Sequence, residues 1–170
     1  DNIYKPKHNG ALRVQRAFLE PSAKIFPETA RAIREADVVV ICPGSLYASL
    51  VPNFLVEGMR EALRESKAKK VAICDLMTQW GQTNDFVASD MIKELLAYSG
   101  LSKFDYCVCN TAEIDATLLE SYAKENKRPI RCDEKLKGQA ENIITGDFFS
   151  AADIARHDSE KVAKVISALE

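Results

Sequence analysis

The sequence has no apolar run of the roughly 18 residues that a helix needs to cross a bilayer, and it does not open with a signal-peptide pattern. It also lacks an excess of basic residues, since 23 lysines and arginines stand against 25 acidic residues. Dedicated nucleic-acid-binding domains usually show a clear basic excess. We therefore expect no membrane span, no nucleic-acid partner and a cytoplasmic protein.

No Cys-x-x-Cys pair occurs among the five cysteines. Cys107 and Cys109 are separated by a single residue, which is the wrong spacing for a common zinc site. Most of the cysteines lie inside or at the ends of apolar runs, where cysteine behaves as a small hydrophobic residue. These observations predict buried, reduced thiols and no metal site.

Several catalytic and nucleotide-binding motifs are also missing. The sequence contains neither a Walker loop nor a Gly-x-Gly-x-x-Gly fingerprint. Ser45 lacks the Gly-x-Ser-x-Gly elbow, although the composition still permits a hydrolase built from serine, histidine and aspartate. The catalytic residues, if any, are therefore unknown from the sequence.

Apolar runs alternate with amphipathic stretches along almost the whole chain. The runs at residues 37–42, 70–76 and 105–110 lack the alternation of half-exposed strands, which indicates strands buried on both faces. Strands joined by helices must be parallel. The pattern predicts an α/β fold, a three-layer sandwich with a mostly parallel sheet, in one domain over residues 1–170.

The amphipathic stretches give the expected helices. Proline suits the first turn of a helix, so a short helix is expected from Pro27. A continuous helix is expected over residues 54–66, and another over 88–99 that ends at Gly100. Further helices are expected at 114–126 and 159–169, and further strands at 12–19, 129–132 and 142–145.

The loop at residues 42–53 follows the first buried strand, where ligands bind in open α/β sheets. It is longer than the roughly 2–6 residues of an ordinary strand-to-helix loop. Gly44 is followed by hydroxyl groups at Ser45, Tyr47 and Ser49. Backbone N–H groups at such a turn favour phosphate, whereas the alternative is a Pro-Gly turn followed by a capping serine.

Two further loops follow the next strands. Residues 77–85 are rich in amide side chains, which recognise bases, sugars and amides because each offers a donor and an acceptor. Trp80 in this loop can stack on a ring or cover the loop, and the usual burial of tryptophan favours the second. Asn110 ends the third strand and can bind a ligand or cap the following helix.

Arg156 precedes the last predicted helix, for which Asp158 is the expected N-cap. A planar guanidinium suits bidentate recognition of phosphate. The alternative is an arginine paired with an acidic neighbour. The residues alone leave both interpretations open.

Residues 43–53, Pro-Gly-Ser-Leu-Tyr-Ala-Ser-Leu-Val-Pro-Asn, strongly resemble the gluconeogenesis factor family, which is similar in turn to the 2-phospho-L-lactate transferases. The match continues in order through residues 77–83, 89–90, 105–110 and 156–158. Family members begin with a Gly-rich nucleotide loop that this sequence does not contain. The resemblance therefore covers the carboxyl-terminal half of a family member.

The resemblance implies a Rossmann-like protein that binds a nucleotide sugar such as UDP-N-acetylglucosamine and regulates carbon metabolism and cell-wall morphogenesis. An alternative is a transferase that uses a guanosine-activated phospholactate donor, and only this alternative implies Mg²⁺. A second alternative is a protein-interaction scaffold. No other cofactor is expected, and the resemblance leaves open whether a reaction is catalysed.

The motifs and the resemblance together imply a set of ligand-binding residues. They are Pro43, Gly44, Ser45, Leu46, Tyr47, Ser49, Asn53, Met77, Thr78, Gln79, Thr83, Asn110, Tyr122 and Arg156.

The sequence departs from the family pattern at four positions. Trp80 stands where proline is usual, and Asp75 where asparagine is common. Gln82 replaces a usual glutamate and Met91 a frequent histidine. The last two changes remove groups capable of metal binding or acid–base chemistry.

We expect the 170-residue chain to fold and to form a homo-oligomer. The central strands and their helices are all present, while edges that the other half of a family member would cover are left exposed. Sedimentation velocity over a range of concentrations measures this. A strictly monomeric chain that binds nucleotide tightly would contradict the expectation.

Overall fold

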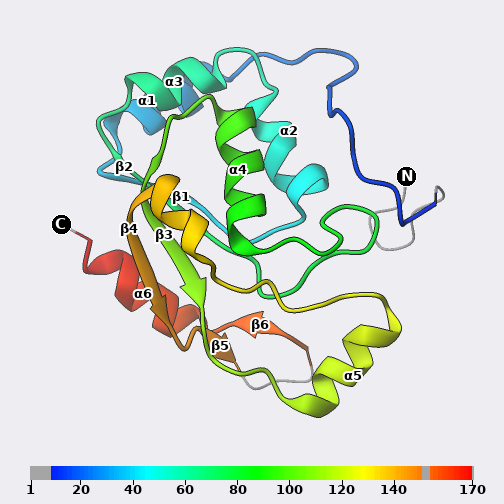
Figure 1. The fold of residues 1–170 in the computed structure, drawn as a ribbon. Helices are drawn as coiled ribbons and strands as arrows, with labels where there is room; N and C mark the ends of the chain where they lie inside the picture. Colours follow the sequence, from blue (N-terminus) through cyan, green and yellow to red (C-terminus); the bar gives the residue numbers. More distant parts are fainter. Residues whose placement is uncertain (1–8, 151–153, 170) are drawn as a thin grey trace.

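The structure, a computed structural model, describes residues 9–150 and 154–169. Its centre is a parallel sheet in the order β1-β2-β3-β4 (Figure 1). The strands are β1 (Val38–Ile41), β2 (Lys69–Ile73), β3 (Phe104–Asn110) and β4 (Ala140–Gly146). The predicted α/β fold with a parallel sheet is confirmed.

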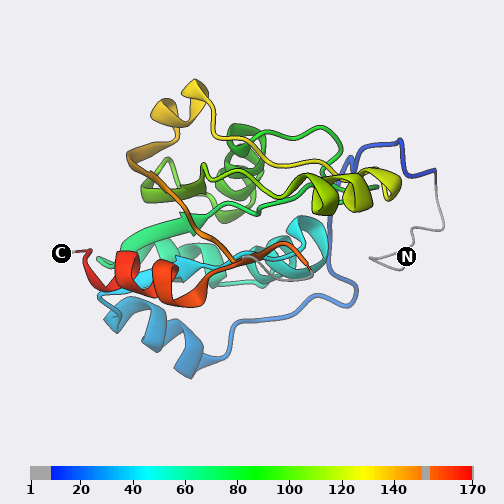
Figure 2. The ribbon, with the colours of Figure 1, turned by 90° about the horizontal axis from the view of Figure 1, so that it is seen from below.

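Alternate residues of the central strands enter two separate cores. Ala72 and Cys107 face a core that contains Met91 and Leu95 of helix α4 (Ala88–Ser99). Their neighbours Val71 and Val108 face the opposite core, against which helix α6 (Ser159–Ser167) packs. Figure 2 shows α4 and α6 on opposite sides of the sheet. The sheet is therefore the middle of three layers.

Helix α4 has the bounds predicted for the helix over residues 88–99, and Gly100 ends it with φ +72°. Helix α1 (Pro27–Glu35) begins at its proline, as predicted. The predicted helix at 114–126 is α5 (Ala116–Lys124), and the side chain of Asp158 caps α6 as expected. The longest described helix, α4, has 12 residues, and none is long and apolar enough to span a membrane.

The continuous helix predicted over residues 54–66 is wrong. A π-helical turn, η1 (Leu46–Leu50), leads into α2 (Val51–Phe54), and α3 (Met59–Glu65) follows only after a break. Gly58 ends the break with φ +92°, and Glu57 pairs with the chain around Lys24 through backbone hydrogen bonds. Both pieces bury apolar residues at helical spacing, which is why the pattern resembled one helix.

The strands predicted at residues 12–19 and 129–132 are also wrong. The first segment makes no strand pairing, and the side chains of Leu12 and Phe18 are 60% and 64% exposed. The second makes one isolated antiparallel bridge, between Pro129 and Met77. Proline has no N–H to donate to a sheet, and the segment crosses the end of β2 instead of lying along an edge.

The cysteines follow the prediction in part. All five are free thiols, and Cys74, Cys107 and Cys109 are buried. Cys132 is half-buried, and Cys42 is exposed because it stands where β1 gives way to the following loop. Burial is therefore wrong for Cys42.

We expect Gly58→Ala to lower the free energy of unfolding by roughly 1–3 kcal/mol, because a side chain at positive φ is strained. The added Cβ would also lie 2.7 Å from Cγ2 of Ile25. Gly138→Ala is the matched control, since its Cβ would meet no heavy atom within 4 Å. Urea denaturation of both variants measures the effect, and equal stabilities would contradict it.

Candidate functional site

A cavity of about 630 Å³ opens at the carboxyl ends of β1 and β2. Its walls come from the loops after these two strands, from α5 and the residues after it, and from β6 (Arg156–His157). In Figure 1 the arrowheads of β3 and β4 point toward the same end of the molecule, where α5, β5 (Phe149–Ser150) and β6 lie. This is the place where ligands bind in open parallel sheets.

Many of the predicted binding residues meet in this cavity although they are far apart in sequence. Those that line it are Pro43, Gly44, Ser45, Met77, Thr78, Gln79, Tyr122 and Arg156. The remaining wall consists of Asp75, Leu76, Lys127, Ala155 and His157.

The turn that carries Arg156 is tied to α5 by one hydrogen bond. The backbone N–H of Ala155 donates to the hydroxyl of Tyr122 at 3.0 Å. Arg156 itself is exposed, and no acidic side chain of the described residues forms an ion pair with it. The ion-pair interpretation of Arg156 therefore has no partner within residues 9–150 and 154–169, and the guanidinium can receive an anion.

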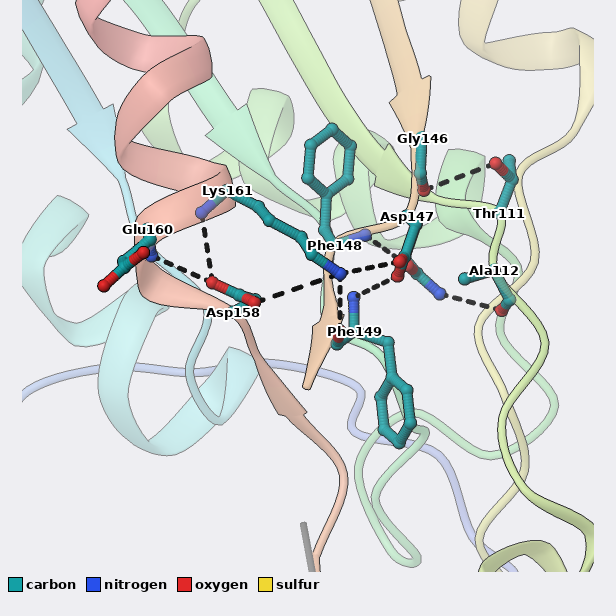
Figure 3. A network of polar contacts seen from close by, with 10 residues as sticks. Thr111, Ala112, Gly146, Asp147, Phe148, Phe149, Asp158, Glu160 and Lys161 are labelled. Carbon is teal, nitrogen blue, oxygen red and sulfur yellow. Dashed lines mark hydrogen bonds and ion pairs between the residues drawn. The ribbon is translucent and has the colours of Figure 1, made fainter. Parts of the chain in front are cut away.

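A polar network fixes the other end of the same turn (Figure 3). Lys161 donates to the carboxylate of Asp147 at 2.6 Å and to the carbonyl of Phe149 at 3.3 Å. Asp158 caps α6 with its side chain, and its N–H donates to the carbonyl of Phe148 at 2.8 Å. These contacts pin β5 and β6 to the start of α6.

Asn110 takes part in this framework and does not line the 630 Å³ cavity. Its Oδ1 accepts from the N–H of Phe148 at 2.8 Å, and its Nδ2 donates to the carbonyl of Ala112 at 3.0 Å. The residue lines a neighbouring cavity of about 650 Å³. Both ends of the amide are thus engaged by the protein's own backbone.

The other predicted residues of the loop after β1 do not line the cavity, and Ser49 and Asn53 are exposed. Leu46 is 1% exposed in the core, and Tyr47 packs edge-on against Tyr98. The Nδ2 of Asn53 donates to the carbonyl of Ser49 at 2.6 Å, within the turn that follows Gly44.

The loop after β2 has a similar internal support. Thr83 is buried, and its hydroxyl accepts from the N–H of Gln79 at 2.8 Å. Trp80 lies against the backbone of Gly10, where an added Cβ would meet its Nε1 at 2.1 Å, and it faces another cavity. Trp80 therefore packs against the chain and also lines a cavity, so both interpretations of this residue stand.

Asp75, which departs from the family pattern in the sequence, also lines the cavity. It follows β2 directly, and its Oδ1 accepts from the N–H of Gly44 at 2.9 Å. Burial raises the pKa of Asp75 to about 7, while the hydrogen bond from Gly44 acts in the opposite direction. An acidic residue at the end of a buried strand was the signal that could have identified it.

The charge around the cavity is set by its cations. Lys127 lies over the ring of Tyr122, with Nζ 5.6 Å from the ring centroid, and forms an ion pair with Glu125. Burial lowers the pKa of His157 despite a hydrogen bond to the backbone of Cys74, so that the imidazole is neutral at pH 7. Arg156, Lys127 and one carboxyl of raised pKa together favour an anionic ligand.

The described residues contain no group of three or more side chains that could hold a metal ion. The cavity is lined by the carboxyl group of Asp75, the imidazole of His157, and hydroxyl and amide groups. Mg²⁺ is usually held by one or two carboxylates together with substrate phosphates, and Asp75 is the one carboxyl group that the described residues bring to the cavity wall.

Known proteins are similar to this chain over most of its length. A family model described as 2-phospho-L-lactate transferase CofD matches residues 2–149. The gluconeogenesis factor of Halalkalibacterium halodurans is 40% identical over 158 residues, which cover 91% of this chain and 49% of that protein. The gluconeogenesis factor of Bacillus subtilis is 38% identical over 157 residues, which cover 91% of this chain and 50% of that protein.

A solved structure shares the fold. A crystal structure of a Bacillus halodurans protein superposes with a TM-score of 0.86 at 40% identity, over 91% of this chain and 51% of that one. The chain spans about half the length of the curated relatives it matches.

The raised pKa of Asp75 predicts a dependence of stability on pH. Between the ordinary carboxyl pKa of 3.8 and about 7, the folded protein binds one proton more than the unfolded chain. The free energy of unfolding therefore falls as the pH rises through this window. Asp75→Asn removes the titration. The free energy of unfolding of the variant should therefore rise by about 2–3 kcal/mol relative to that of the wild type between pH 5 and pH 8.

Urea denaturation of both proteins at the two pH values measures this difference. Asp105→Asn is the control, because Asp105 also accepts a backbone N–H, that of Lys70, but lies away from the cavity. If the free energies of unfolding of the wild type and of Asp75→Asn change by the same amount between the two pH values, Asp75 is ionised at both.

Proposed function

The chain belongs to the 2-phospho-L-lactate transferase CofD family, and we propose that it binds a nucleotide sugar of the UDP-N-acetylglucosamine type. In this proposal it acts as a gluconeogenesis factor that regulates carbon metabolism and cell-wall morphogenesis, in the cytoplasm and as a homo-oligomer. The observation that supports it most is the meeting of Arg156, Tyr122 and the Gly44 turn in one cavity.

Arg156 and Lys127 are suited to the diphosphate. The exposed guanidinium of Arg156 can bind two phosphate oxygens at once, and Lys127 adds a second positive charge on the neighbouring wall. Ser45 offers a hydroxyl beside them. This arrangement favours a phosphate-bearing ligand over a neutral sugar.

Other residues of the cavity are suited to the neutral parts of the ligand. Met77, Gln79 and Tyr122 line the cavity and bring an apolar chain, an amide group and a phenol ring to it. Amides and phenol rings recognise bases and sugars through hydrogen bonds and stacking. The volume of about 630 Å³ lies within the range of about 300–1,000 Å³ typical of small-molecule sites.

The second candidate is phospholactyl transfer, which the description of the family model favours. It would require a guanosine-activated donor and Mg²⁺. The cavity offers Asp75 as its carboxyl group, and Gln82 and Met91 stand where the family usually has a carboxylate and an imidazole. These residues support nucleotide-sugar binding better than metal-dependent transfer.

Thermal unfolding in the presence of nucleotide sugars tests the proposal. A ligand at 100 times its dissociation constant stabilises the native state by about 2.7 kcal/mol. UDP-N-acetylglucosamine should therefore raise the melting temperature, and GDP should not do so to the same extent. The absence of a shift with any nucleotide sugar would leave the scaffold alternative.

We expect Arg156→Lys to weaken binding of UDP-N-acetylglucosamine about ten- to a hundredfold, because lysine keeps the charge but loses the bidentate contact. Tyr122→Phe should also weaken binding, since it removes the acceptor for the N–H of Ala155 and loosens the turn that carries Arg156. Calorimetric titration measures both dissociation constants.

Arg64→Lys is the matched control, because Arg64 is an exposed arginine of α3 that does not line the cavity. It should bind like the wild type. If Arg156→Lys and Tyr122→Phe also bind like the wild type and only lose stability, the two residues are structural and the diphosphate binds elsewhere.

A further inference from the structure

The Gly44 turn already has a partner for its backbone donor. The N–H of Gly44, which a phosphate-binding turn would direct at the ligand, donates to Oδ1 of Asp75 at 2.9 Å. Asp75 lines the same cavity as Gly44 and Arg156. An ionised carboxylate at this place would repel a phosphate and keep the N–H occupied.

A neutral carboxylic acid has the opposite effect on the same ligand. Its O–H can donate a hydrogen bond to a phosphate oxygen, and no negative charge opposes the anion. Burial raises the pKa of Asp75 to about 7, so the neutral form is accessible near physiological pH. A diphosphate placed beside the carboxyl group would favour this form further.

We propose that Asp75 receives a phosphate group of the ligand as a neutral carboxylic acid, so that binding to the ionised protein takes up one proton. The inference rests on the proposed function and adds a binding residue to that site. Binding is then the association of protein, ligand and one proton whenever Asp75 is ionised in the free protein.

The other groups around Asp75 do not account for such a proton. Lys127 and Arg156, from the segment after α5 and from β6, contribute positive charge. His157 is neutral, because burial lowers its pKa, and the pKa of the adjacent Cys74 thiol is raised by Cys107 and Cys109. From α4, Met91 approaches the backbone N–H of Asp75 with its sulfur at 3.5 Å, and Tyr122 presents a phenol.

Asparagine, the neutral side chain nearest in shape to aspartate, supplies a test in a single substitution. Asp75→Asn keeps an oxygen that can accept from Gly44 and removes the titrating proton. A neutral side chain of the same shape should bind the ligand as the protonated aspartic acid does. The substitution therefore separates the role of the proton from the role of the shape.

Calorimetric titration with UDP-N-acetylglucosamine from pH 6 to pH 8 is the experiment, because its diesterified diphosphate does not titrate in this range. Wild-type affinity should fall about tenfold from pH 6 to pH 8, since the fraction of neutral Asp75 falls about tenfold. Titrations in two buffers of different ionisation enthalpy should show uptake of close to one proton at pH 8. Asp75→Asn should show constant affinity and no proton uptake.

A wild-type affinity that does not change with pH overturns the proposal. A pH dependence of affinity that persists in Asp75→Asn overturns it as well. A pH dependence that disappears in His157→Gln instead assigns the proton to the imidazole and overturns it equally. Affinity that rises with pH and requires Mg²⁺ would show an ionised Asp75 that holds a cation. Binding whose affinity does not depend on pH refutes the role of Asp75 alone. No binding by either protein at any pH refutes the proposed function as well.

Discussion

Parallel pairing of the four strands is the constraint on which the rest of the structure depends. Because β1 to β4 run in one direction and in sequential order, every strand ends at the same side of the sheet. The loops after β1 and β2 therefore converge, and Gly44 comes within hydrogen-bond distance of Asp75 across a sequence separation of 31 residues. The cavity is a direct consequence of this alignment.

The central elements could be predicted because their signals are local and strong. The apolar runs of β2 and β3 and the capped, amphipathic α4 each carry their pattern within a dozen residues. The failures depend on distant contacts. Residues 12–19 have the composition of a strand but pair with no described strand, and the break before Gly58 is fixed by the chain around Lys24, more than 30 residues earlier.

The candidate site was predictable as a set of loops but not as a set of contacts. Sequence order identifies the residues that follow a strand, and three of these, Ser45, Thr78 and Gln79, line the cavity. It does not show which side chain faces the cavity and which supports the loop from behind, as Leu46 and Thr83 do. Asp75 was overlooked because its burial is a property of the packed sheet.

The segment that carries Arg156 is held by hydrogen bonds at two separate points, with Tyr122 at one end and with Lys161 at the other. Its strand pairing is short, since β5 and β6 pair through only two residues each. Such a segment can open locally while the sheet stays folded. A ligand that contacts both Arg156 and the Gly44 turn would hold the segment at a third point. Amide hydrogen exchange in β5 and β6 would then be slower when the ligand is bound.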